Sequence, residues 1–324
     1  ITMITGTIIT ICSSSWVGMW VGLELNLLSI IPLMSNTKNK METEAAMKYF
    51  ITQALASTIL LMAAIMTLQD KMTMWETAES IQMDSAILTK MGAAPFHFWF
   101  PEVMEGLSWS NATILLTWQK IAPMTILTYT KKTSMFMMIS ILMAMMISGI
   151  MGINQTSMKK ILAYSSINHI GWMMSSILTN QAIWIMYLTI YSMMTINITM
   201  MMKMLNTSNI NQLMMFMNSE KSLKILFSMN FLSLGGIPPF IGFMPKWITI
   251  NYLVNCNSLL MTTLMIISTL MTLFFYLRLT MTSIIMNQTI KSITKTKMNK
   301  TLLTKINFLT LSSLSLCTMM IYFN

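Results

Sequence analysis

The chain has 324 residues, of which 55% are hydrophobic and only 9% are charged. Soluble domains usually carry about 25% charged residues, so this composition excludes an ordinary water-soluble fold. The net charge is +10. Loops that flank a bilayer need lysines, so this charge does not point to nucleic acid, and no nucleic-acid partner is expected.

The apolar runs of the sequence indicate helices that cross a membrane. A bilayer is spanned by about 20 apolar residues, and only helices or closed barrels satisfy their backbone groups in lipid. The runs here are continuous and do not alternate, which favours helices. The sequence therefore predicts an all-α polytopic protein, a single membrane domain over 1–324, with about eleven spans.

The expected spans follow the chain in order. The first, a partial one, lies at the start of the sequence, so no cleavable targeting segment is expected. The ninth is too long for one plain helix and contains Gly235-Gly236-Ile237-Pro238-Pro239, so it is expected to be two half-helices joined by a break. The spans are 1–12, 16–34, 45–66, 80–100, 109–129, 135–153, 159–178, 182–202, 222–254, 259–279 and 302–323.

Loop charge predicts the orientation of the chain. When Lys48, Lys90, Lys120 and Lys246 are set aside, sixteen basic residues remain in loops or near the ends of spans: Lys71, Lys131 and Lys132 fall on one side and thirteen on the other. Cytoplasmic or matrix loops carry the excess of Lys and Arg. The N-terminus is therefore expected on the matrix side and the C-terminus on the outer side.

Four charged residues lie where lipid-spanning helices should be apolar: Glu24, Lys90, Lys120 and Lys246. A charge at the bilayer centre costs at least about 2.5–3.5 kcal/mol on insertion scales. Desolvation disfavours the charged form of a lysine and a nearby carboxylate favours it, so such a pair can load and release a proton. The structural alternative, an ion pair with snorkelling lysines, fits Lys48 near the end of its span.

Two histidines and two breaks add to this set. His97 follows Pro95, and His169 lies among polar neighbours within a span. A histidine in such a place is either a hydrogen-bonded core residue or a proton relay, and the sequence does not separate the two. Discontinuous helices in transporters expose backbone groups near a polar midplane site, and breaks at Pro95 and Pro238-Pro239 each lie close to a buried lysine.

No redox cofactor or metal is expected on this chain. Cys12, Cys256 and Cys317 show no paired spacing, and the sequence has neither a Gly-rich nucleotide loop nor a cysteine cluster for iron–sulfur ligation.

At these residues the chain resembles the antiporter-like membrane subunits of respiratory NADH:ubiquinone oxidoreductase, or complex I. The resemblance runs through most of the chain in order. It rests on Trp16–Asn26, Glu44–Ala56 (EAAMKYFITQALA), Lys90–Val103 (KMGAAPFHFWFPEV), Leu116–Pro123 (LTWQKIAP), Lys160–Trp172 (KILAYSSINHIGW) and Leu232–Trp247 (LSLGGIPPFIGFMPKW).

The resemblance implies two inverted five-helix repeats, at 1–129 and 135–279, each with a broken helix, followed by a C-terminal helix at 302–323. It implies that Glu24 is a gating carboxylate, Lys90 its partner, Lys120 a central relay and Lys246 the terminal residue of the path. The wider family has about fourteen helices, so three N-terminal helices are expected to be absent here while the repeats stay whole.

The resemblance also implies a setting for the chain. The protein would lie in the mitochondrial inner membrane and move protons, while NADH, FMN, iron–sulfur clusters and ubiquinone bind other subunits of the complex. Neighbours of the chain 4 and chain 4L type are expected, with lipid, including cardiolipin, around them. Two rival functions stay open: a free-standing cation/proton antiporter, and a structural subunit whose charges are ion pairs.

Overall fold

The computed structural model describes residues 1–36, 39–69, 76–130, 134–217, 221–238 and 240–285. These residues form helices joined by turns and short extended segments. The chain divides into two compact units, Ile1–Ala144 and Met145–Asn324, and the boundary falls within helix α8 (Ser134–Ile153). The predicted repeat limits, 1–129 and 135–279, and the C-terminal helix at 302–323 stay predictions; the last of these lies outside the described residues.

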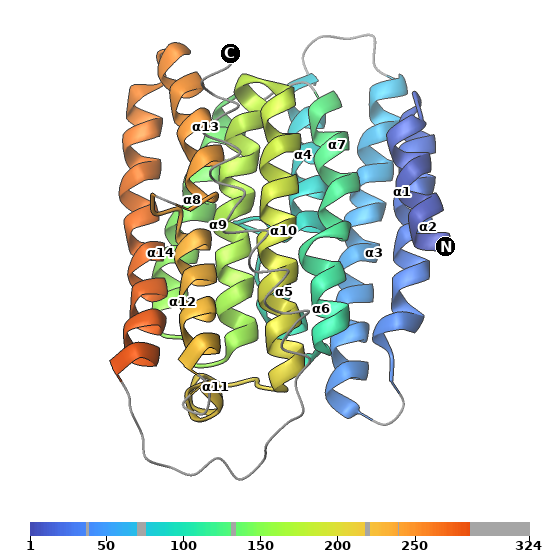
Figure 1. The fold of residues 1–324 in the computed structure, drawn as a ribbon. Helices are drawn as coiled ribbons and strands as arrows, with labels where there is room; N and C mark the ends of the chain where they lie inside the picture. The colour runs from blue at the N-terminus through green and yellow to red at the C-terminus, as the bar shows by residue number, and fades with distance from the viewer. Residues whose placement is uncertain (37–38, 70–75, 131–133, 218–220, 239, 286–324) are drawn as a thin grey trace. The chain divides into compact units, whose positions relative to one another are not determined.

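The first unit is a bundle of helices (Figure 1). α1 and α2 pack along each other, and glycines make this contact close. A Cβ atom on Gly22 would lie 2.8 Å from the backbone oxygen of Gly6, and one on Gly6 would lie 3.0 Å from the backbone nitrogen of Asn26. The helices of this unit, besides α8, are α1 (Thr2–Cys12), α2 (Trp16–Met34), α3 (Lys40–Gln69), α4 (Glu76–Met91), α5 (Trp99–Gly106), α6 (Trp109–Leu116) and α7 (Ile121–Tyr129).

The predicted span at 80–100 is interrupted, as Pro95 indicated. α4 ends at Met91, and Gly92 has a φ of +72°, the left-handed conformation that commonly follows a helix end. The backbone N–H of Ala93 donates to the oxygen of Leu88, which closes the last turn. The chain is not helical again until α5, so Lys90 sits in the last turn of a half-helix.

The predicted span at 109–129 contains an interruption that was not predicted. α6 ends at Leu116, a short 3-10 turn covers Trp118–Lys120, and α7 begins at Ile121. Pro123 explains the change, because proline has no N–H to give the carbonyl of Gln119 and its ring clashes with that carbonyl in a continuous helix. Beginning a new helix puts Pro123 in the first turn, where the missing N–H costs nothing.

The second unit surrounds α9 (Met158–Thr179) (Figure 1). Eighteen of the 22 residues of α9 are buried, and they include serines, an asparagine and a histidine. A helix buried on all sides meets protein rather than lipid, so it can carry polar side chains around its circumference. The other helices are α10 (Gln181–Leu205), α11 (Ile210–Met217), α12 (Lys221–Gly235), α13 (Phe243–Asn255) and α14 (Leu259–Ile285). The short helix α11 falls in a segment that the sequence predicted as a loop.

The predicted break within 222–254 is confirmed. α12 ends at Gly235, and Gly236 has a φ of +75°. The N–H of Gly236 donates to Leu232 and Ser233, in the manner of a glycine cap at a helix C-terminus. α13 begins only at Phe243, so seven residues separate the two half-helices. Of the proline pair, Pro239 lies outside the described residues.

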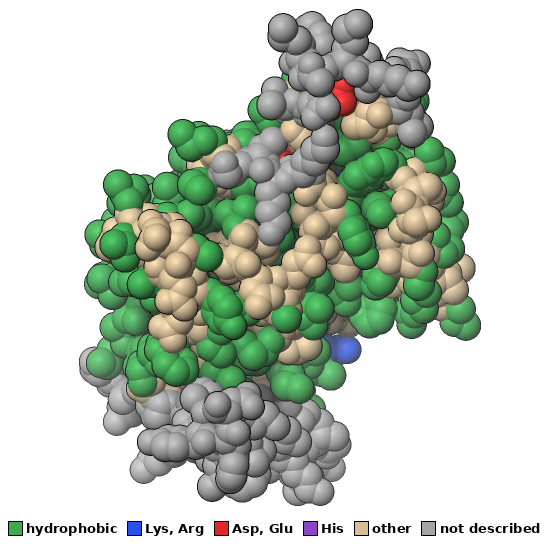
Figure 2. Space-filling model, turned by 90° about the horizontal axis from the view of Figure 1, so that it is seen from above, with side chains coloured by type: hydrophobic (Ala, Val, Ile, Leu, Met, Phe, Trp, Pro, Cys, Tyr) green, Lys and Arg blue, Asp and Glu red, His purple; other side chains and the backbone are tan. Residues whose placement is uncertain are grey.

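The described surface is that of a membrane protein. Within the described residues, five helices are long and apolar enough to cross a membrane by length and composition, at Trp16–Met34, Lys40–Thr67, Met135–Ile153, Gln181–Leu205 and Leu259–Met281. Hydrophobic side chains cover much of the face that Figure 2 presents. Several of them are more than half exposed, including Leu55, Ile139, Ile185, Leu260 and Phe274. The total of eleven spans and their arrangement as inverted repeats stay predictions.

Candidate functional site

Glu24 and Lys90 come close enough to interact electrostatically, although they do not form a direct ion pair. Glu24 is half-buried on α2, and its Oε2 atom is buried without a hydrogen-bond partner among the described residues. Lys90 is only 8% exposed. Its side-chain amine makes no hydrogen bond or ion pair within the described part of the chain, and Glu24 is the carboxylate that acts on it at longer range.

The side chain of Lys90 lines a small cavity of about 20 Å³. The apolar part of its wall comes from Leu23, Leu27 and Pro123, and the polar part comes from Asn26, Tyr49, Gln53, Lys90 and Gln119. A cavity needs about 10–15 Å³ and two to four polar partners to hold a water molecule. This cavity meets both conditions.

Three amide side chains around the cavity join four segments of the first unit. Gln119 Nε2 donates to Asn26 Oδ1 over 2.9 Å, and the Tyr49 hydroxyl donates to Gln119 Oε1 over 3.4 Å. Gln53 Nε2 donates to the backbone oxygen of Lys90 over 3.4 Å, at the end of α4. Asn26, Gln53 and Gln119 were not among the predicted site residues, although an amide inside an apolar span is a signal that could have found them.

Lys120 lies next to Gln119, at the end of the 3-10 turn. It is 2% exposed, and its amine lies 5.7 Å from the centre of the Phe100 ring. A cation over an aromatic face is stabilised by the electrostatic field of the ring. Phe100 follows the first break, and its side chain also contacts the position that a Cβ of Gly92 would take, at 3.0 Å. The ring thus lies between Lys120 and the glycine turn that ends α4.

Lys246, in the second unit, reaches back across the second break. Its Nζ donates to the backbone oxygen of Gly235 over 2.9 Å, and the side chain is 7% exposed. The last carbonyls of a helix have no partner within the helix, and the helix dipole favours a cation there. Lys246 therefore caps the C-terminal end of α12 from the first turns of α13.

The two histidines are both buried but differ in their surroundings. His97 lies within the first break, where its Nδ1 is 3.3 Å from the oxygen of Pro95. His169 lies on α9, where its Nδ1 is 2.9 Å from the hydroxyl of Tyr187 and its ring centre is 4.9 Å from that of Tyr191. His169 thus contacts a side-chain hydroxyl, whereas Nδ1 of His97 contacts a backbone carbonyl.

Two acidic residues change the charge balance that the sequence predicted. Asp84 is fully buried on α4, so Glu24 is not the only acid among the buried charges of the first unit, contrary to our interpretation. Asp84 falls within the predicted span at 80–100 but was not among the predicted site residues, and the helix that carries it begins earlier, at Glu76.

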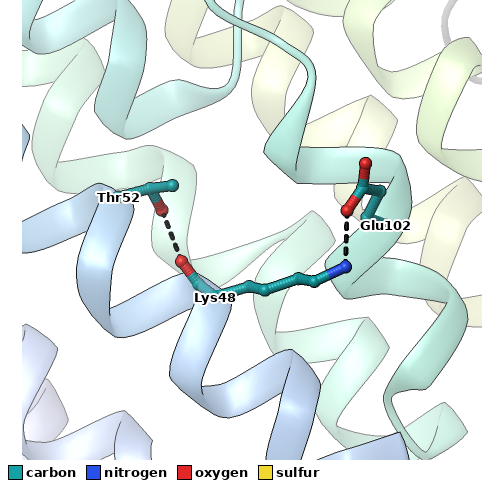
Figure 3. Close-up of polar contacts among 3 residues, drawn as sticks. All are labelled: Lys48, Thr52 and Glu102. Atoms are coloured by element: carbon teal, nitrogen blue, oxygen red, sulfur yellow. Dashed lines mark hydrogen bonds and ion pairs between the residues drawn. The ribbon is translucent and has the colours of Figure 1, made fainter.

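The second acid, Glu102, pairs with Lys48. The Lys48 Nζ lies 2.6 Å from Glu102 Oε2, and the two side chains are 54% and 57% exposed (Figure 3). The pair links α3 to α5, the half-helix that follows the first break. Lys48 is therefore an ion-paired residue, as the structural alternative for it allowed, and it stands apart from the buried lysines.

Comparison with known proteins identifies the family. Residues 13–272 match the family model described as NADH:quinone oxidoreductase/Mrp antiporter, TM. NADH-ubiquinone oxidoreductase chain 2 of Anopheles gambiae is 45% identical over 291 residues, which are 89% of this chain and 85% of that protein. The proteins of the same name from Locusta migratoria and Loxodonta africana are 42% and 41% identical, over 92% and 86% of this chain and 88% and 82% of their own lengths.

Solved structures share the fold at lower sequence identity. A chain in the respiratory complex I of Thermus thermophilus matches with a TM-score of 0.86 and 21% identity, over 96% of this chain and 75% of that chain. A chain in the Mrp complex of a Dietzia species matches with a TM-score of 0.75 and 16% identity, over 91% and 61% of the two chains. The chain therefore belongs to the NADH:quinone oxidoreductase/Mrp antiporter family and, within it, to the NADH-ubiquinone oxidoreductase chain 2 group of antiporter-like membrane subunits.

Proposed function

We propose that this chain translocates protons across the mitochondrial inner membrane as a subunit of respiratory NADH:ubiquinone oxidoreductase. Glu24, Lys90 and Lys120 would carry the protons in the first unit, and Lys246 in the second. His97 and His169 are candidate relays. The redox reaction, with NADH, FMN, iron–sulfur clusters and ubiquinone, would take place on other subunits, and quinone reduction there would drive the transfer.

One observation carries the proposal. Lys90 is buried and lines a cavity large enough for one water, and its amine is influenced by a carboxylate with which it forms no ion pair. A directly paired lysine would be held in its charged form, and a dry lysine would have no proton acceptor. A lysine between these limits can change its protonation when the carboxylate moves or when water supplies an acceptor. The charges are expensive to keep in a membrane, which itself favours a functional role.

The proposal predicts a specific loss on neutralisation of Glu24. In the assembled complex, Glu24→Gln should leave Lys90 without its carboxylate and favour the neutral amine. We expect less proton translocation together with slower coupled quinone reduction, while assembly is largely kept. Lys40→Met is a suitable control, because Lys40 is an exposed residue at the start of α3. Both rates should be measured in sealed vesicles, with and without an uncoupler.

The same measurements separate the rival functions. A structural subunit would give full assembly and unchanged proton translocation after Lys120→Met, which would refute the proposed role of that lysine. A free-standing antiporter would exchange cations for protons when the chain alone is placed in vesicles. Because Lys120 is buried and lies over an aromatic ring, the Lys120→Met variant is the more informative of these two tests.

The proposal includes the surroundings of the chain. Other membrane-arm subunits, with neighbours of the chain 4 and chain 4L type, would cover part of its apolar surface, and lipid, including cardiolipin, would cover the rest. Related chains occur in membrane complexes of several kinds, which supports obligatory partners. Eleven spans with the N-terminus in the matrix are part of the same proposal and rest on the apolar runs and the loop charges, and the two inverted repeats rest on the family resemblance.

A further inference from the structure

The cavity beside Lys90 has the properties of a built water site. All five of its polar side chains come from different points along the first unit, on α2, α3, α4 and the 3-10 turn. Four of them are nine-tenths or more buried: Asn26 is 3% exposed, Tyr49 4%, Gln53 5% and Lys90 8%. Burying a polar group without a partner costs about 1–3 kcal/mol, so these groups need partners inside the protein.

The hydrogen bonds among these side chains account for only part of what they can form. Gln119 and Asn26 each have an amide with two donors and an acceptor, and one donor and one acceptor are used between them. The Tyr49 hydroxyl donates a hydrogen bond to Gln119, and its lone pairs can still accept one. Gln53 donates one N–H to the Lys90 carbonyl, and its side-chain oxygen can still accept a hydrogen bond. The Lys90 amine brings up to three donors. Donors and acceptors therefore face one small cavity with bonds still to be made.

We propose that this cavity binds a single water molecule that accepts a hydrogen bond from the Lys90 amine, and that Gln119 is the residue that positions it. The inference rests on the proposed function and names the group to which Lys90 first gives its proton. In that step an N–H bond of the lysine ammonium breaks and an O–H bond of the water forms. The water passes another of its protons onward, so the lysine is left neutral and the water is unchanged.

Gln119 is suited to this role because of the segments it joins. It precedes Lys120 in the 3-10 turn, and it is bonded to Asn26, two residues from Glu24 on the same helix. A change in the position of either charged segment would shift the amide and with it the water. Such a link makes the proton acceptor of Lys90 depend on both neighbouring charges without a direct ion pair between them.

Removal of the amide tests the inference. In the assembled complex, Gln119→Met keeps the length of the side chain and removes its amide. We expect proton translocation to fall on the order of tenfold, as misplacement of a reacting group commonly produces, while the amount of assembled complex stays the same. Gln82→Met is the matched control, because Gln82 is an exposed residue of α4, the helix that carries Lys90. It should leave translocation unchanged.

A paired exchange guards against a variant that simply misfolds. Asn26→Leu and Gln119→Met should each lower translocation, whereas the double exchange Asn26→Gln with Gln119→Asn keeps both amides and their combined length and should restore most of it. A structure of the wild-type complex that resolves waters should show one water within hydrogen-bond distance of Lys90 Nζ, and the Gln119→Met complex should not. If the amides served only to fill space, Asn26→Leu and Gln119→Met, which keep most of the side-chain volume, would leave translocation unchanged.

The outcomes separate this inference from the proposed function. If Glu24→Gln lowers translocation and Gln119→Met does not, the proposed function stands and the positioning role of Gln119 is wrong. If neither variant lowers translocation, the proposed function fails. A wild-type structure with no water at Lys90 would overturn the water site whatever the rates are.

Discussion

Lys246 donates a hydrogen bond over 2.9 Å to the backbone oxygen of Gly235, so the side chain of one half-helix caps the end of the other. Gly236, between them, has a φ of +75°, and a Cβ there would lie 3.0 Å from both Cδ and Nζ of Lys246. The turn and the Lys246 side chain therefore share one space, and only a glycine at position 236 leaves that space open.

Gly236→Ala should disturb both the turn and the hydrogen bond of Lys246. The left-handed conformation costs a non-glycine residue about 1–2 kcal/mol, and the added methyl group pushes the amine from the Gly235 carbonyl. We expect a lower melting temperature of the complex and slower proton translocation. Gly235→Ala is the control, because its Cβ would meet only the Tyr276 ring at an ordinary 3.5 Å within a helix. Equal effects of the two variants would contradict the shared-space explanation.

The ion pair between Lys48 and Glu102 should hold α5 against α3. Charge reversal by Lys48→Glu or Glu102→Lys places like charges in contact, and we expect less assembled complex with either variant. The double reversal restores opposite charges and should restore assembly, as measured by native gel electrophoresis. Because both side chains are more than half exposed, water screens the pair, so neutralisation of either residue should have a smaller effect than charge reversal. A double reversal no better than the single ones would show that the pair does not set the position of α5.

Loss of the hydrogen bond between His169 and Tyr187 should reduce proton translocation more than loss of an exposed tyrosine hydroxyl does. Tyr187→Phe removes one partner of His169 Nδ1 at a net cost of about 0.5–1.5 kcal/mol and leaves the ring packing in place. If His169 relays protons, translocation should fall while the melting temperature changes by only a few degrees. Tyr129→Phe, at a side chain that is 56% exposed, should change neither. A loss of stability without a loss of translocation would indicate a purely structural histidine.

Cys12 and Cys256 provide a direct test of orientation. Both are free and exposed, and the predicted topology places both on the outer side of the membrane. A membrane-impermeant maleimide should label them from the outer face of the inner membrane and not from the matrix face. Cys317, which lies outside the described residues, should be changed to serine so that the label can be assigned to the other two cysteines. Labelling from the matrix face alone would show that the predicted topology is the wrong way round.

The breaks were predictable because their cause is local. Gly236 and Pro238 lie within one segment, and the effect of each on a helix needs no knowledge of the rest of the fold. Pro123 was harder, because a proline inside a long apolar run is compatible either with a kinked helix or with a new helix. The structure shows the second, with the 3-10 turn that places Gln119 toward the cavity.

The polar wall of the cavity could not be predicted in the same way. Asn26 and Gln119 are 93 positions apart, and each alone is a polar residue in an apolar span. Their pairing is a property of the bundle, since it depends on how α2 lies against the turn before α7. The buried acid Asp84 was missed for a related reason, because its depth depends on where α4 begins.

The close packing of α1 on α2 limits how Glu24 can move. Gly6 and Gly22 let the two backbones approach until there is no room for a methyl group, just before the turn that carries the carboxylate. A sliding of α2 along α1 would break this fit at several points. Any gating by Glu24 would then come from rotation about its own side-chain bonds, which moves the carboxylate by a few ångströms while α2 stays in place against α1.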